Sequence, residues 1–173
     1  WLAQRLEDAL MDEMPADTTN GHRILLLAGW YGVTNLLLRT RSRVPIEYVC
    51  SVDLDPACKI MSEKINNAWN WRGEFASIVY DINYFDYTSN EFNIVINSSV
   101  EHLSSMEWYH NIPKGTLVCL QASDMDHDDH VINISHPREL LEKYPMSELI
   151  YEGIKLFEFD TTQFRRSMII GIK

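Results

Sequence analysis

Cysteines, basic side chains and long apolar runs are all scarce in this sequence, and each shortage excludes a class of protein. The three cysteines show no metal-like spacing, so we expect reduced thiols rather than a zinc module or a disulfide scaffold. With 15 Lys and Arg against 25 Asp and Glu, the formal net charge is −10. Because phosphate contacts need clustered basic side chains, this charge argues against a nucleic-acid partner. No apolar run is long enough to span a bilayer, so we expect no membrane partner.

Length and composition are typical of a folded globular protein. The 173 residues fit one domain, and 46% hydrophobic with 23% charged residues is ordinary for such proteins. We expect an N-terminal helix and loop over residues 1–20 and a single domain over residues 21–173. Reduced cysteines and the lack of a visible signal peptide favour a cytoplasmic location. The chain begins at Trp1, which leaves open whether the native N-terminus is longer.

The most informative segment runs from residue 23 to residue 55. Its pattern predicts a buried strand over 24–28, a glycine turn over 29–32, a helix over 33–41 and a second strand over 48–52 that ends in Asp53-Leu54-Asp55. That order is a βαβ unit, in which the two strands are parallel. A glycine turn after the first strand, with an acid after the second, is how such folds hold a nucleoside. The sequence therefore predicts a ligand site at this edge of the sheet.

The rest of the chain continues the alternation of strands and helices. Further strands are predicted over 75–80, 92–96 and 116–121, and helices over 1–14, 56–69, 100–110 and 137–143. Two extended runs, 149–159 and 164–172, are joined by a tight connection and predict an antiparallel hairpin. The sequence thus predicts an α/β protein with a mostly parallel, seven-stranded sheet, helices on both faces and a C-terminal antiparallel hairpin.

Polar residues recur where the predicted strands end. Gly29 to Gly32 follow the first strand, Asp53 to Asp55 the second, Asp81-Ile82 the third and Asn97-Ser98 the fourth. With this pattern, residues 21–173 resemble the class I S-adenosylmethionine-dependent methyltransferases, within an uncharacterised methyltransferase-like group of bacteria and phages. The resemblance implies a three-layer Rossmann-like fold and S-adenosylmethionine as the cofactor.

The resemblance also implies a role for each strand end. In that family the glycine turn meets the cofactor, the acid after strand two binds the ribose hydroxyls, the residues after strand three flank the adenine, and strand four ends beside the methyl group. The cofactor-binding residues implied here are Gly29, Trp30, Tyr31, Gly32, Asp53, Leu54, Asp55, Asp81, Ile82, Asn97 and Ser98. Asp53 and Asp55 compete for the ribose, because Asp55 before Pro56 is also a good helix N-cap.

The first turn departs from the family pattern. It has fewer glycines, Trp30 and Tyr31 fill it, and Leu27 stands where the family has an acid. An altered but working pocket and a relic that no longer binds are both compatible with these changes. The fourth strand also lacks the Pro-Pro-aromatic sequence of enzymes that methylate exocyclic amines of bases, which argues further against a DNA substrate.

Asn97 and His102 are the candidate catalytic residues. Asn97 closes a strand whose carboxyl end should line the crevice. His102 could act as a general base, since its ordinary pKa lies near neutrality, or it could face solvent or cap the next helix. Residues 124–130 hold four aspartates and two histidines, but neighbours in one loop rarely converge on one ion. We therefore predict no metal from that run, and interpret it as a solvated loop or a lid over the substrate.

Three functions compete at this point. The first is a methyltransferase using S-adenosylmethionine on a small-molecule or protein acceptor. The second is a non-catalytic binding or assembly module that keeps the fold. The third is transfer of an aminopropyl or aminocarboxypropyl group from the same donor or a derivative of it. The sequence leaves the acceptor and the oligomeric state open.

Overall fold

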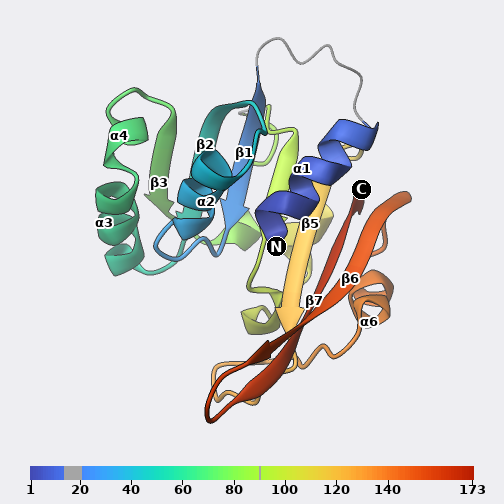
Figure 1. The fold of residues 1–173 in the computed structure, drawn as a ribbon. Coiled ribbons are helices and arrows are strands. Elements are labelled where there is room, and N and C mark those ends of the chain that lie inside the picture. The colour runs from blue at the N-terminus through green and yellow to red at the C-terminus, as the bar shows by residue number, and fades with distance from the viewer. Residues whose placement is uncertain (14–20, 90) are drawn as a thin grey trace.

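A seven-stranded sheet runs through the whole molecule (Figure 1). The computed structural model describes residues 1–13, 21–89 and 91–173. The strand order is β3-β2-β1-β4-β5-β7-β6. The strands are β1 (His22–Leu27), β2 (Ile46–Asp53), β3 (Phe75–Val79), β4 (Ile94–Asn97), β5 (Leu117–Ser123), β6 (Glu148–Glu158) and β7 (Gln163–Ile172). The first five strands are parallel, and β7 is antiparallel to both β5 and β6, which confirms the predicted sheet and its terminal hairpin.

Helices cover both faces of the sheet. They are α1 (Leu2–Glu13), α2 (Val33–Arg41), α3 (Pro56–Ile65), α4 (Asn67–Asn70), α5 (Glu107–Asn111) and α6 (Pro137–Lys143), with 3₁₀ turns η1 (Ile82–Tyr84) and η2 (Val100–His102). None of the described helices combines the length and apolar character that crossing a membrane requires. Met14 and the predicted loop over 15–20 lie outside the described residues.

Two predicted helices were wrong in their extent. The helix over 56–69 is broken at Asn66, whose buried side-chain amide donates to the carbonyl oxygens of Gly32 and Ser62 and accepts from Asn35. These bonds tie the chain to the first turn and end α3. The helix over 100–110 is two short elements, because the backbone becomes extended at Leu103 before α5 begins at Glu107.

Alternation along the strands builds a core on each face. Ile24 and Leu26 point toward a cluster that includes Leu6 of α1 and Leu38 of α2. Leu25 and Leu27 point the other way, into a cluster with α5 and α6 residues. All of these side chains are buried. Because side chains of successive strand residues point to opposite faces, β1 contributes to both cores, and the sheet is the middle layer of a three-layer structure.

Gly29 allows the first turn to lie directly on β2. A Cβ atom built on Gly29 would stand 2.2 Å from the Ser51 Oγ, so no larger residue fits unless Ser51 changes. The backbone of Gly29 does not have a positive φ angle, so the requirement for glycine here is one of space. The contact brings the turn after β1 beside the carboxyl end of β2.

A double-mutant cycle tests this contact. We expect G29A to lower the free energy of unfolding by about 1–3 kcal/mol, the usual cost of overpacking. S51A should cost little, because the buried Ser51 hydroxyl has no hydrogen-bond partner in the described part of the chain. The double variant G29A/S51A should therefore recover most of the loss, as measured by urea denaturation. Additive losses in the double variant would contradict this account of Gly29.

Candidate functional site

The first four strands of the parallel sheet end side by side. In the strand register, Leu27 of β1 is opposite both Val52 of β2 and Asn97 of β4, and Asp53 is opposite Val79 of β3. The Gly29 amide donates to the Val52 carbonyl oxygen at 3.2 Å. The carboxyl ends of parallel strands are where open α/β sheets bind ligands, so the predicted strand-end residues share one edge of the molecule.

The Asp53 carboxylate joins the first turn to the end of β2. Its Oδ2 accepts from the Trp30 amide at 2.9 Å, and its Oδ1 accepts from the Asp55 amide at 3.0 Å. Trp30 and Ala28 both have φ near +47°, a left-handed conformation that costs a non-glycine residue about 1–2 kcal/mol. The bond from Asp53 holds Trp30 in that conformation, so the same carboxylate fixes the turn and faces the open edge.

A crevice of about 470 Å³ opens at this edge. Within the described part of the chain it is lined by Ala28, Trp30, Asp53, Ser99 and His102. Its volume lies in the range of about 300–1,000 Å³ that is typical of small-molecule sites. Trp30 forms an exposed aromatic wall, stacked on Tyr31 with ring centroids 4.2 Å apart. Three of the residues predicted for the site, Trp30, Asp53 and His102, therefore meet in one hollow.

Four other predicted residues from this edge are not among the lining residues of the crevice. Gly32, with φ +67°, packs against Ser62 and Asn66 of the next helical segment, and Tyr31 supports the Trp30 ring. The Asp55 carboxylate accepts from the Ala57 amide at 2.8 Å and caps α3. Leu54 is 70% exposed. The choice between Asp53 and Asp55 thus favours Asp53 as the carboxylate that faces a ligand.

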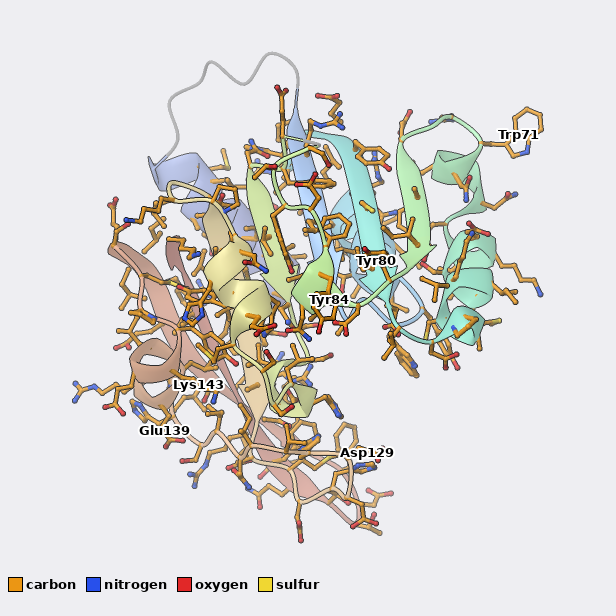
Figure 2. The ribbon with its side chains drawn as sticks, turned by 180° about the vertical axis from the view of Figure 1, so that it is seen from behind. Trp71, Tyr80, Tyr84, Asp129, Glu139 and Lys143 are labelled. Atoms are coloured by element: carbon orange, nitrogen blue, oxygen red, sulfur yellow. The ribbon has the colours of Figure 1, made fainter. Side chains whose placement is uncertain are left out.

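The residues after β3 have structural partners instead. The Asp81 Oδ1 accepts from both the backbone and the side-chain amide of Asn83, each at 2.9 Å, and so caps η1. Ile82 is buried in one of the two cores. Two exposed tyrosines, Tyr80 and Tyr84, flank these residues on the side of the sheet seen in Figure 2. Asp81 and Ile82 lie one strand farther along the edge than Asp53.

Asn97 is fully buried at the end of β4. Its Oδ1 accepts from the Ser99 amide at 3.0 Å, while its Nδ2 has no hydrogen-bond partner among the described residues. An unsatisfied buried donor costs about 1–3 kcal/mol, which a bound ligand could offset. Ser98 points away from the crevice and lines a separate cavity of about 260 Å³ together with residues of α1 and α2.

His102 lines both the crevice and a further cavity, distinct from the one that Ser98 lines, which we call the second cavity. That cavity, also about 260 Å³, is lined by Glu101, His102, Ser123, Met125, His127, His130, Phe164 and Arg166. Glu101 is 1% exposed, and its Oε1 accepts from the Ser123 hydroxyl at 3.1 Å and from Arg166 at 3.2 Å. Four of the lining residues, Ala28, Ser99, Glu101 and Arg166, were not predicted as site residues from the sequence. Arg166 lies 65 positions from Glu101, and no local pattern links the two.

Burial makes the cysteine thiols poor candidates for a catalytic role. All three are free, and burial raises the pKa of both Cys50 and Cys58 to about 11. For Cys58, the nearby carboxylates of Asp53 and Asp55 add to the effect of burial. A thiol with so high a pKa stays protonated near neutrality and is a poor nucleophile. The predicted reduced state of the three cysteines agrees with this arrangement.

Comparison with known proteins establishes the fold. No protein-family model matches the sequence, and no curated protein matches it. Among solved structures, TehB from Haemophilus influenzae has a TM-score of 0.67 and 16% identity, over 98% of this chain and 62% of TehB. The YcgJ protein from Bacillus subtilis has a TM-score of 0.71 and 11% identity, over 99% of this chain and 97% of YcgJ. A geranyl diphosphate methyltransferase in complex with GPP and sinefungin has a TM-score of 0.67 and 11% identity, over 98% and 77% of the two chains. The Rossmann-like methyltransferase fold predicted from the sequence is therefore confirmed.

Neighbouring aspartates allow a matched test of the site. We expect D53N to lower the free energy of unfolding by about 1–2 kcal/mol, because the new amide group cannot accept from one of the two backbone N–H donors. D55N should be nearly neutral, since Asn and Asp are equally good N-caps. Urea denaturation of both variants checks this. Equal losses would show that Asp53 is no more than a second cap.

Proposed function

We propose that this protein transfers a methyl group from S-adenosylmethionine to a small-molecule or protein acceptor. The observation that carries the proposal is the crevice at the carboxyl ends of the parallel strands, which Asp53 faces. A second observation is the unsatisfied, buried side-chain amide of Asn97 at the end of the adjacent strand β4. The shared fold with a methyltransferase whose structure holds sinefungin, an analogue of S-adenosylmethionine, supports the same donor. As part of the proposal, residues 21–173 act as one domain in a reducing compartment such as the cytoplasm, consistent with three free thiols.

The residues of the crevice fit the polar groups of that cofactor. A carboxylate has about four lone-pair positions, and the two backbone bonds of Asp53 leave room for ribose hydroxyls. Ala28 has only a methyl side chain, so the backbone of the first turn is open to close approach. Trp30 would cover the ligand with its exposed ring.

Methyl transfer requires little from the protein beyond correct positioning of the methyl donor and the acceptor. The bound cofactor supplies an activated methyl group on a positively charged sulfur. A lone pair of the acceptor forms the new bond to the methyl carbon while the carbon–sulfur bond breaks, its electron pair stays on sulfur, and the acceptor loses a proton. Holding the two reactants in line in a dry site accounts for much of such a rate enhancement. His102 lines the crevice where it could receive the acceptor's proton.

Titration calorimetry with S-adenosylmethionine and S-adenosylhomocysteine tests the proposal. We expect both to bind with a Kd in the micromolar range, and to stabilise the fold by about 2.7 kcal/mol at a hundredfold excess over Kd. D53N should weaken binding at least about tenfold, a loss of about 1.4 kcal/mol. D55N, which keeps its cap, should bind as the wild type does.

The alternatives give different results. A folded protein that binds neither compound would support a non-catalytic module. Chromatography of the products separates the transfer reactions: methylthioadenosine formed from S-adenosylmethionine would identify aminocarboxypropyl transfer, and methylthioadenosine formed only from decarboxylated S-adenosylmethionine would identify aminopropyl transfer.

A further inference from the structure

Three potential metal ligands converge at the boundary between the crevice and the second cavity. They are Glu101 and His102, which follow β4, and His130 from the loop after β5. One ligand atom from each of these residues lies within 4.8 Å of the other two. We call these residues the Glu-His-His cluster. The long loop of aspartates and histidines contributes a single member, and the other two come from a different strand end.

Each histidine has its Nδ1 atom beside a backbone carbonyl oxygen. The Nδ1 of His102 lies 3.1 Å from the Asp129 carbonyl oxygen, and the Nδ1 of His130 lies 2.8 Å from the Met125 carbonyl oxygen. A carbonyl oxygen only accepts, so each Nδ1 carries the hydrogen and each Nε2 keeps a free lone pair. Such a backbone bond on the second nitrogen is the usual way in which proteins orient a metal-bound imidazole.

The carboxylate of Glu101 is buried and half satisfied. Its Oε1 accepts two hydrogen bonds, whereas its Oε2 has no partner among the described residues although Glu101 is only 1% exposed. A buried carboxylate oxygen without a partner is costly unless a cation or donor meets it. This observation is independent of the histidine geometry and points to a ligand at the same place.

The loop that carries His130 is fixed to Glu101 through the backbone. The amides of Val131 and Ile132 donate to the Glu101 carbonyl oxygen at 2.9 and 3.2 Å. The third ligand is therefore held beside the first two by bonds that do not depend on an ion. The backbone framework of the cluster is therefore in place before an ion binds.

Charges around the cluster are balanced rather than uniformly positive. Arg166 contacts Glu101 at 3.2 Å and adds positive charge on one side. The loop that carries His130 also carries Asp126, Asp128 and Asp129. Figure 2 shows Asp129 at the end of the molecule where the β6–β7 hairpin projects, far from Trp71. These carboxylates offset Arg166 and draw cations toward the cavity.

We propose that the Glu-His-His cluster binds one divalent transition-metal ion of the zinc class. Two imidazole nitrogens and one carboxylate oxygen suit such an ion, whereas Mg²⁺ and Ca²⁺ prefer oxygen ligands alone. Three protein ligands leave coordination positions open. Because His102 lines both hollows, an ion bound there would lie next to the crevice, where an acceptor with a coordinating oxygen could reach it.

The site of the ion and its role rest on different grounds. Metal binding follows from the cluster alone, while the role of holding the acceptor oxygen rests on the proposed function. A bound ion would occupy the lone pair of His102 that otherwise accepts a proton, so the two roles of His102 exclude one another.

Titration calorimetry of the EDTA-treated full chain with ZnCl₂, in the absence of cofactor, tests the site. We expect one Zn²⁺ per chain with a Kd in the micromolar range or tighter, and no heat with MgCl₂. H102A and H130A should each weaken Zn²⁺ binding at least about tenfold, and E101Q should also weaken it. Circular dichroism checks that each variant is folded.

His127 provides the matched control. It lies in the same loop, with its ring centroid 5.5 Å from that of His130, but it is not a member of the cluster. H127A should leave the Zn²⁺ affinity unchanged within about threefold, less than half the free energy of a tenfold change. Equal losses in H127A and H130A would overturn the proposal, because the loop rather than the cluster would then hold the ion. Failure of the folded wild type to bind Zn²⁺ would also overturn it.

Parallel titrations with S-adenosylhomocysteine separate this inference from the proposed function. Cofactor binding without Zn²⁺ binding would overturn the metal site alone. Zn²⁺ binding without cofactor binding would support the metal site and overturn methyl transfer.

Discussion

The contact between the Asp53 carboxylate and the Trp30 amide is the interaction on which the candidate site depends. It links the turn after β1 to the end of β2, and it holds a non-glycine residue in a left-handed conformation. Such strain persists only where the surroundings impose it, and here the packing of Gly29 on Ser51 and of Gly32 on α3 supplies that constraint. The crevice therefore exists because two glycines let the turn sit close to β2 while one carboxylate fixes its direction.

The sheet was predictable because its signals are local. Short apolar runs separated by glycine, proline and acidic residues mark each strand, and the amphipathic segments between them predict parallel order. The failures came where a distant residue decided the structure. The break at Asn66 depends on Gly32 and Asn35, more than thirty positions away, which no pattern around residues 56–69 reveals.

The residues of the candidate site also divide into those that a local pattern predicts and those whose position depends on distant contacts. Asp53, Trp30 and His102 were predicted, because strand ends in such a fold face one edge. The sequence could not decide between Asp53 and Asp55, since both follow the same strand. The structure separates them by the partner each carboxylate has: the turn for Asp53 and the start of α3 for Asp55. The proximity of His130 to Glu101 depends on how the loop after β5 folds back, which no local pattern in residues 124–130 reveals.

The altered first turn can be explained as a working variant of a glycine-rich turn. Leu27, where the family has an acid, is buried in the core, so that position contributes packing. The left-handed conformations occur at Ala28 and Trp30, which are not glycines. The hydrogen bond from the Trp30 amide to the Asp53 carboxylate offsets part of the conformational strain of the turn. Strained non-glycine residues cluster at sites where binding depends on the exact backbone path. The strained residues Ala28 and Trp30 both line the crevice, which is consistent with the proposed binding function.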